Sequence, residues 1–574
     1  MSDHDTIIRG GTVVDGTGAP ARTADVAIDN GVITEVGKVS GSAARTIDAD
    51  GLLVTPGFVD IHAHYDGQAS WGERMIPSSW HGVTTVVVGN CGVGFAPVHP
   101  NDHDRLIELM EGVEDIPGAV LQEGLAWNWQ SFPEFMDSLD GRNYDVDVAV
   151  QVPHGALRLH VMGERGARRE VATPDDIAAM ARIAREGIEA GALGFTTSRT
   201  LNHRTSKGEF TPTLTAEADE LIGIARAIGE TGKGVLQGVS DFADVDAEFS
   251  IFRRMSEASG RPVSFSLVQV RGDTWRRQLE LLAEANADGV KMTAQVAPRP
   301  VGLMLGLECT LHPLLANPVY REIAASPLAE RVAIMRDPDF KARVLAADAS
   351  KREDAGSRVI QAFDRMFELG DPPDYEPDPA ASVGARARRE GRAALDLAYD
   401  MLLHDGGRSF LYMPFLNYAD GNLDAVGEML AHPNTVIGLA DGGAHLGTIC
   451  DASFPTTLLT LWVRDRDHGR LDLPFAVQRH TSATARTVGL LDRGVLAPGY
   501  RADVNLIDFD RLTARRPEMH HDLPAGGKRL VQSAEGYVAT LVAGEITYEN
   551  GDTCGPLPGR LVRGPQAAPA TGAK

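Results

Sequence analysis

Apolar residues recur along the middle of the chain in eight short runs, most of them followed by a stretch with helical periodicity. The runs are rich in β-branched residues and are apolar on both faces, which is typical of strands buried in a parallel sheet. Eight such strands alternating with helices predict an α/β fold, a (β/α)8 TIM-like barrel. The runs lie within residues 52–66, 83–94, 144–158, 191–199, 232–241, 261–272, 289–300 and 434–445.

The two ends of the chain instead alternate short β-type runs with tight turns. Asn30 with Gly31, and Asn550 with Gly551, form the Asn-Gly dipeptides that favour hairpin turns. Such pieces at opposite ends predict one small β-sandwich domain built from both termini, residues 1–56 plus 487–574. The barrel is then expected at 57–486. The small and polar residues 564–574 predict a disordered tail.

Residues 303–410 do not fit a single strand–helix unit. The segment contains two stretches of helical sequence around a polar, proline-containing stretch at 369–384. We expect a helical insertion after the seventh strand. A segment of this length is usually functional or locally disordered. The alternatives that we consider are a lid over the barrel mouth and an oligomer contact.

The charge, the cysteine content and the length of the apolar runs exclude several classes of protein. The net charge is −24, from 55 basic and 79 acidic residues, and this argues against a nucleic-acid partner. Four scattered cysteines do not form a disulfide framework. No signal-peptide pattern opens the sequence, and no apolar run approaches the roughly 20 residues that span a bilayer. We expect a cytoplasmic homo-oligomer with a small-molecule substrate and no membrane partner.

The first barrel run ends in a pair of histidines, His62 and His64. Alternate residues of a strand point to the same face, so the two imidazoles project together. At the carboxyl end of a barrel strand that face is the active-site mouth, where both can bind one metal ion. Asp60 is expected to orient the strand end. Asp66 is expected either to support a ligand or to cap the chain.

Two further runs end in candidate ligands. Cys91 sits in a glycine-flanked turn after the second run, where a thiolate would suit zinc and a buried apolar thiol is the alternative. Asp441 closes the eighth run before two glycines. A carboxylate at this place can bind metal and take a proton from water. His445 follows four residues later, as a catalytic or a loop histidine.

Together these motifs resemble the amidohydrolase superfamily, and more narrowly its D-aminoacylase (N-acyl-D-amino-acid deacylase) branch. The resemblance rests on IIRGGTVVDGTG, HAHYD, GNCGVGFAP, PHGALR, GLADGG and DRGVLAPGYRADVNLIDFD, and it runs from about residue 5 to 562 with a break at 303–410. It implies zinc and hydrolysis of an amide bond. Carried over, His62, His64 and Asp441 match the ligands of one metal position, and Cys91 matches the thiolate of the tightly bound zinc.

The pattern breaks on the fifth and sixth strands, from each of which the family takes one histidine. Val239 and Leu267 occupy those positions, and no histidine lies anywhere between His203 and His312. Neither aliphatic side chain binds metal, so we expect one zinc ion rather than two. Substitute ligands at Gln237, Asp241 and Gln269 are the weaker alternative.

The lysine that helps the family receive a substrate carboxylate is also replaced, here by Gln269. Other groups after the barrel strands are therefore candidates for substrate binding, although each is commonly a structural polar residue. His154 of PHGALR matches a family motif and is expected to shape its loop. The candidates are Arg199, His203, Gln269, Arg271, Gln295, Arg299 and His445.

The sequence thus predicts a metal-dependent amidohydrolase that cleaves an N-acyl amino acid or a similar N-acyl compound. A metal-activated water would attack, and Asp441 would act as general base. The same chemistry on a cyclic amide, an ester, a lactone or an exocyclic amine is one alternative. A metal-free scaffold of the same fold is another, since two expected ligands are missing.

Overall fold

The computed structural model describes residues 2–270, 272–347 and 360–570. Its centre is the predicted barrel, an all-parallel sheet in the order β16-β12-β11-β10-β9-β8-β7-β6. The strands are β6 (Phe58–Asp60), β7 (Val83–Val88), β8 (Asp147–Pro153), β9 (Gly194–Arg199), β10 (Val235–Ser240), β11 (Val263–Ser266), β12 (Met292–Val296) and β16 (Thr435–Ile437).

The barrel closes between its first and last strands. Ala63 and Gly442 pair in parallel just beyond β6 and β16. The His64 N–H donates to the Gly442 carbonyl at 2.7 Å, and the Asp441 N–H donates to the His62 carbonyl at 3.0 Å. Closure therefore brings the two histidines and Asp441 to the same rim, although they lie almost 380 positions apart in the sequence.

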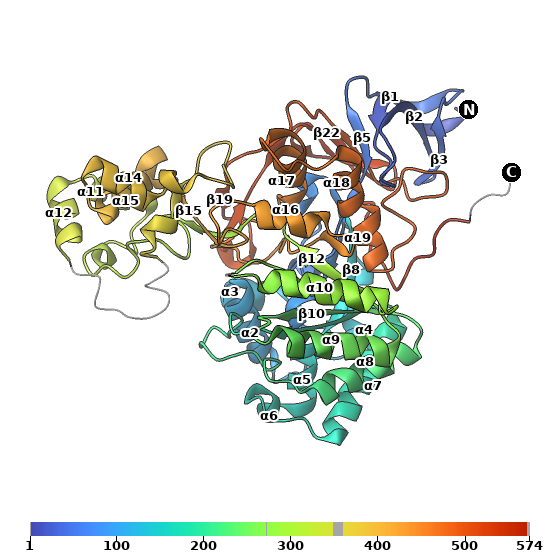
Figure 1. Cartoon of the computed structure of the whole chain (residues 1–574), viewed down its shortest axis with the longest axis horizontal. Helices are drawn as coiled ribbons and strands as arrows, with labels where there is room; N and C mark the ends of the chain where they lie inside the picture. The colour runs from blue at the N-terminus through green and yellow to red at the C-terminus, as the bar shows by residue number, and fades with distance from the viewer. Residues whose placement is uncertain (1, 271, 348–359, 571–574) are drawn as a thin grey trace.

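Helices cover the outside of the barrel, and α7 to α10 lie side by side around it in Figure 1. The helices between β6 and β9 are α1 (Gln68–Trp71), α2 (His103–Glu114), α3 (Gly118–Gly124), α4 (Phe132–Asp140), α5 (His154–Met162), α6 (Glu164–Ala167) and α7 (Pro174–Ala190). Those that follow β9 and later strands are α8 (Ala218–Glu230), α9 (Val245–Ser259), α10 (Thr274–Ala287), α16 (Asp424–Ala431), α17 (Phe454–Thr457), α18 (Leu473–His480) and α19 (Ser482–Thr487).

The ends of α7 show how local sequence sets these helices. Thr173 accepts from the Asp176 N–H, and the Asp176 carboxylate in turn accepts from the Thr173 N–H. This reciprocal cap, with Pro174 at the first helical position, satisfies amide groups that the helix cannot. Gly191 ends the helix with φ of +115°, a conformation that glycine adopts without a steric penalty.

The two ends of the chain form one nine-stranded sheet, as the turn patterns predict. Its two halves meet where β5 pairs antiparallel with β17. Leu506 and Val54 are partners there, and both side chains are fully buried. The strands are β1 (His4–Val13), β2 (Arg22–Asp29), β3 (Val32–Gly37), β4 (Ala43–Asp48), β5 (Leu53–Pro56), β17 (Val504–Ile507), β22 (Tyr537–Val542), β23 (Glu545–Glu549) and β24 (Asp552–Thr553).

Two C-terminal segments leave this sheet and pack on the barrel instead. Residues 513–535 form the short pairs β18 (Thr513–Ala514) with β21 (Ala534–Glu535) and β19 (Glu518–His520) with β20 (Arg529–Val531). The expectation of a disordered tail from residue 564 is wrong for its first part. The Gln566 N–H donates to the Gly489 carbonyl at 2.9 Å, and the Leu491 N–H donates to the Gln566 carbonyl at 3.0 Å. Residues 571–574 lie outside the described residues.

The insertion after β12 is helical and has its own apolar core, which includes Val344, Leu397, Tyr399 and Leu402. Figure 1 shows its helices projecting to the left, clear of the barrel. The flanking strands β13 and β15 pair antiparallel and form a stem, with β14 added to β15. The elements are β13 (Val301–Leu305), α11 (Leu328–Met335), α12 (Pro338–Ala346), β14 (Phe367–Glu368), α14 (Val383–Glu390), α15 (Ala394–Leu402) and β15 (Leu411–Leu416).

The four cysteines are all free, in line with the absence of a disulfide framework in the sequence. Among the described residues, none of the helices combines the length and the apolar composition that would be needed to traverse a bilayer.

Candidate metal centre

Three of the four predicted metal ligands converge at the carboxyl ends of β6 and β7. One ligand atom each from His62, His64 and Cys91 lie within 4.8 Å of one another, and all three side chains are buried. The Nε2 atom of His62 is 3.3 Å from the Cys91 sulfur. Two imidazoles and a thiol form a donor set that suits zinc.

Asp441 joins this cluster from the end of β16. Its Oδ1 atom is 3.4 Å from Nε2 of His62 and 3.6 Å from Nε2 of His64. The same oxygen is buried and makes no hydrogen bond within the described part of the chain. A buried carboxylate oxygen without a hydrogen bond, facing two imidazole nitrogens, is the arrangement that a divalent cation would satisfy. The residues present therefore fit the predicted metal.

The backbone at these ligands is unusual. Cys91, Asp441 and His445 have φ of 53°, 48° and 52°, in the left-handed region that non-glycine residues seldom adopt. Each such residue costs of order 1–3 kcal/mol and persists only where the surroundings hold it. Gly443 shows how closely the last loop packs, because a Cβ there would lie 2.6 Å from Cδ1 of Tyr65.

Neighbours fix the orientation of His62. The Asp60 carboxylate accepts from the His62 backbone N–H at 3.0 Å, as expected for a residue that orients the strand end. The Gln295 side-chain oxygen lies 2.9 Å from Nδ1 of His62. An oxygen acceptor there places the ring proton on Nδ1 and leaves the Nε2 lone pair free. Gln295, considered above for substrate, thus contacts a predicted metal ligand.

Glu114 is a site residue that the sequence reading missed. It ends α2 with a side chain that is 1% exposed, and its Oε1 atom is 3.4 Å from Nδ1 of His64. Its position continues the apolar face of Ile107 and Met110, at spacings of seven and four residues. A carboxylate on the buried stripe of an amphipathic helix is the sequence signal that could have found it.

Burial dominates the electrostatics of the centre. It lowers the pKa of His62 to about 4, so the imidazole is neutral and able to bind metal at pH 7. It raises the pKa of the Cys91 thiol to about 12, so ionisation there requires a nearby positive charge. Burial also opposes the charge on Asp441, but its electrostatic interaction with the facing His64 and His62 rings holds its pKa below the usual range.

The fifth barrel strand, β10, carries one polar side chain, Gln237, toward the centre. Gln237 of β10 is buried, and its Nε2 atom is 3.5 Å from Nδ1 of His62, the nitrogen that Gln295 already engages. Leu267, just after β11, is fully buried in the apolar core. Asp241 binds the Thr200 hydroxyl and the Leu201 N–H. Within the described residues, neither strand supplies a second cluster of metal-binding groups.

Three of the polar candidates for substrate binding are engaged elsewhere. Arg199 forms a two-pronged ion pair with Glu248, at 2.8 and 2.9 Å. Gln269 donates to Asp420 at 2.6 Å and accepts from the Ala419 N–H at 3.2 Å. Substrate would have to compete with these partners.

The third, Arg299, is fully buried. It lies 3.0 Å from Asp451 and stacks over the Tyr375 ring. Arg271, also a candidate, lies outside the described residues.

Two histidines do lie beside the centre. Burial, with the neighbouring charges of His445 and His64, lowers the pKa of His203 to about 3. Its Nδ1 atom is 2.8 Å from the Ser198 hydroxyl. The His445 side chain is 22% exposed, and its Nε2 atom is 3.7 Å from Glu114. His154, by contrast, is buried between Thr197 and Glu220, at 2.8 Å from each, as expected for a residue that shapes its loop.

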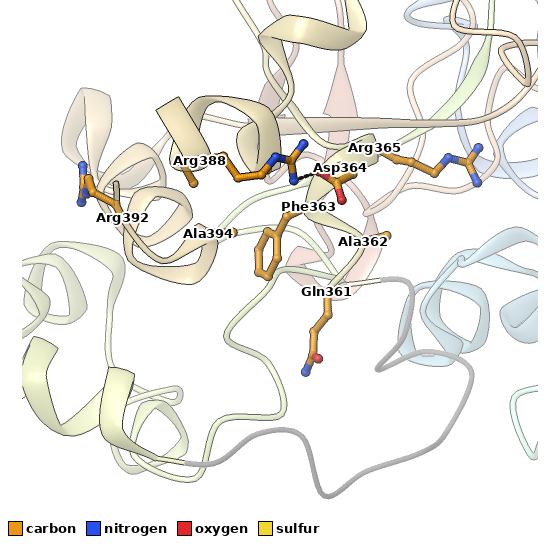
Figure 2. Close-up of a pocket in the computed structure, with 10 residues that line it drawn as sticks. Gln361, Ala362, Phe363, Asp364, Arg365, Arg388, Arg392 and Ala394 are labelled. Carbon is orange, nitrogen blue, oxygen red and sulfur yellow. Dashed lines mark hydrogen bonds and ion pairs between the residues drawn. The ribbon is translucent and has the colours of Figure 1, made fainter. Parts of the chain in front are cut away.

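A separate hollow of about 420 Å³ opens on the insertion, as Figure 2 shows. Asp364 and Arg388 are paired on its wall at 2.6 Å. None of the predicted site residues lines it. We therefore place the functional site at the barrel mouth.

The sequence model of the amidohydrolase family matches residues 45–548. The chain belongs to the amidohydrolase family. A D-aminoacylase from Alcaligenes xylosoxydans xylosoxydans is 33% identical to this amidohydrolase over 518 residues, which cover 89% of this chain and 88% of the relative. An N-acyl-D-aspartate deacylase from the same organism is 27% identical and covers 98% of this chain, with 96% of its own length matched.

A solved structure points to the same branch. It is of a D-aminoacylase, from a study of the functional role of a binuclear metal centre, and it matches with a TM-score of 0.64 at 25% identity. The match covers 98% of this chain and 100% of that chain. This amidohydrolase thus lies in the D-aminoacylase branch. It is a metal-dependent hydrolase that acts on carbon–nitrogen bonds other than peptide bonds, as the motifs predict.

Proposed function

We propose that this amidohydrolase cleaves the amide bond of an N-acyl amino acid, or of a similar small N-acyl compound, at one zinc ion. The observation that carries the proposal is the position of Asp441 Oδ1 at 3.4 and 3.6 Å from the Nε2 atoms of His62 and His64. The buried Cys91 thiol lies in the same cluster. Four donors of these types at the end of barrel strands are a catalytic metal site in outline.

His62, His64, Cys91 and Asp441 would hold the ion. When bound, it would supply polarisation of the substrate carbonyl and a water molecule with a pKa of about 7. Residues of the chain would accept the proton and orient the ligands. Asp441, whose pKa is held low, is ionised at neutral pH and available to accept a proton. Gln295 would keep the Nε2 lone pair of His62 directed at the ion.

Two observations favour one ion over two. Val239 and Leu267 stand where the branch has its strand 5 and strand 6 histidines, and neither side chain can bind metal. The similar D-aminoacylase structure comes from work that describes one-metal activation and second-metal attenuation. A single ion is therefore compatible with turnover in this branch.

The substrate class follows from the relatives and from the mouth. D-aminoacylase and N-acyl-D-aspartate deacylase are among the similar proteins, so N-acyl-D-amino acids are the first candidates. His203 and His445 lie beside the candidate metal ligands and would offer ring N–H groups to a substrate bound there. Gln269 stands at the family's lysine position but is tied to Asp420. We therefore do not assign binding of a substrate carboxylate to Gln269.

The test is a substrate panel on protein of known metal content. N-acyl-D-amino acids, their L-enantiomers, a cyclic amide, an ester and a lactone are assayed with one equivalent of zinc. We expect hydrolysis of at least one N-acyl amino acid and its loss on chelation. Turnover confined to the cyclic or ester substrates would replace the proposed substrate class. Less than about 0.2 metal per chain, unrestored by dialysis against zinc, would instead favour a scaffold.

A further inference from the structure

The carboxylate of Glu114 faces the imidazole of His64 from the side away from Asp441. Glu114 Oε1 lies 3.4 Å from Nδ1 of His64, whereas Asp441 Oδ1 lies 3.6 Å from Nε2. The two ring nitrogens of His64 are therefore divided between two carboxylates. Nε2 faces the predicted metal ligands, and Nδ1 faces Glu114.

Neither of these facing atoms is otherwise engaged. His64 Nδ1 and both carboxylate oxygens of Glu114 are buried and make no hydrogen bond within the described part of the chain. A buried donor or acceptor that lacks a hydrogen-bond partner costs about 1–3 kcal/mol of stability, and more if the group is charged. Each group is therefore the nearest potential hydrogen-bond partner of the other, at 3.4 Å.

We propose that Glu114 is a positioning residue of the metal centre. Its carboxylate accepts a hydrogen bond from Nδ1–H of His64, which keeps the ring proton on Nδ1 and presents the Nε2 lone pair to the metal. The inference rests on the metal site of the proposed function and adds a residue to it. A carboxylate behind a metal-binding imidazole raises the basicity of the ligand as well as setting its direction.

The backbone around Glu114 holds the carboxylate in place. The His445 N–H donates to the Glu114 carbonyl oxygen. The Asp115 carboxylate accepts from the Gly447 N–H at 3.2 Å and from the Thr310 hydroxyl at 3.1 Å. The end of α2 is thus bound to the loop after β16 and to the insertion. His64 gains a support whose position three separate segments determine.

A direct ligand role for Glu114 would require its oxygens to lie with the other donors. They lie instead beside Nδ1 of His64 and 3.7 Å from Nε2 of His445. Asp441 Oδ1, by contrast, faces the Nε2 atoms of both His62 and His64. The geometry therefore assigns Glu114 to the support of a ligand.

The test compares two variants by zinc affinity, measured by competition with a chelating indicator. Glu114→Gln keeps an oxygen acceptor of the same length, and Glu114→Leu removes it. We expect zinc to bind about 10-fold more weakly to Glu114→Gln and about 100-fold more weakly to Glu114→Leu, which spans the usual effect of losing such a support. Glu108→Gln is the matched control, because Glu108 lies on the same helix and pairs with Lys207 away from the centre.

Cobalt substitution and melting of the metal-free proteins separate positioning from the other roles. We expect an unchanged thiolate-to-cobalt absorption band and a metal-free Tm within about 2 °C of wild type in Glu114→Gln. A changed coordination spectrum would make Glu114 a ligand and overturn the proposal. So would equal zinc affinity in all variants. Failure of the wild-type protein to bind zinc would refute the metal site itself, which is a different result.

Discussion

The side-chain oxygen of Gln295 lies 2.9 Å from Nδ1 of His62, on the side of the ring away from Cys91 and Asp441. The amide nitrogen of Gln295 donates to the Ser264 hydroxyl at 3.0 Å, which fixes the orientation of the amide. Nδ1 of His62 thus faces a neutral amide, whereas Nδ1 of His64 faces the carboxyl group of Glu114.

Replacing Gln295 should weaken the metal site without removing a ligand. In Gln295→Leu the Nδ1 proton of His62 loses its acceptor, and the ring is free to rotate or to move its proton to Nε2. We expect zinc affinity to fall about 10–100-fold. Competition titration measures this, with Glu108→Gln, at a carboxylate paired with Lys207 away from the centre, as the control. Unchanged affinity in Gln295→Leu would show that the packing of the ring alone is sufficient.

Asp441→Asn should separate catalysis from metal binding. The amide cannot accept a proton at neutral pH, so we expect kcat to fall by about 10²–10⁴. His62, His64 and Cys91 remain, and metal content should stay near that of the wild type. Turnover and metal per chain are measured on the same preparation. Asp465→Asn, at an exposed carboxylate, is the control. Near-full activity in Asp441→Asn would contradict the role of base.

Zinc should stabilise the fold as well as support activity. A ligand at 100 times its Kd stabilises the native state by about 2.7 kcal/mol. We expect chelation to lower Tm and abolish turnover together, and added zinc to restore both. Magnesium at the same concentration is the control, because a hard cation does not suit imidazole and thiolate donors. Full restoration by magnesium would argue against the His and Cys ligands.

A buried network at Glu220 makes stability depend on pH. Burial alone would raise the pKa of Glu220, but the hydrogen bond from His154 and the charge of Arg158 hold it below its usual value. The folded pKa is thus lower than the unfolded value of about 4.3. Its contribution is complete above that value and is lost as the pH falls through the folded pKa. We expect the urea midpoint to fall below about pH 4.3.

Glu220→Gln tests this assignment. Breaking a buried ion pair by removing one partner costs about 3–5 kcal/mol, and Arg158 is 1% exposed. The variant should unfold at lower urea at pH 7 and should lose less further stability on acidification than the wild type. Glu186→Gln, at an exposed pair with Arg182, should change stability by under about 0.5 kcal/mol. An equal acid response in wild type and Glu220→Gln would assign the pH dependence to other carboxylates.

The barrel and the positions of three candidate ligands could be predicted because their signals are local. Strand periodicity is visible within a few residues, and alternation along one strand places His62 and His64 on one face. Asp441 could be placed because an apolar run ends at it. The single sheet made by both chain ends was visible in turn dipeptides such as that at Asn30.

The partners of the supporting residues could not be predicted, because they depend on contacts between distant segments. Gln295 meets His62 across 233 positions, and Arg199 pairs with Glu248 on a helix after the next strand. Nothing near Glu114 in the sequence indicates that α2 ends against the loop after β16. The first part of the expected tail is held by Gly489 and Leu491, through backbone groups that side-chain composition does not reveal.

The stem of the insertion has a consequence for how this protein can change. Leu305 and Leu411 are partners in the β13–β15 pair, so the chain leaves the barrel and returns to it at neighbouring points. The pair of strands at the base of the insertion is therefore a place where sequence can be inserted or removed. The outer part of the insertion, around α11 and α12, can be exchanged or lengthened while the strands that carry the candidate metal ligands keep their register. Related barrels can in this way gain different insertions while the residues at the barrel mouth stay the same.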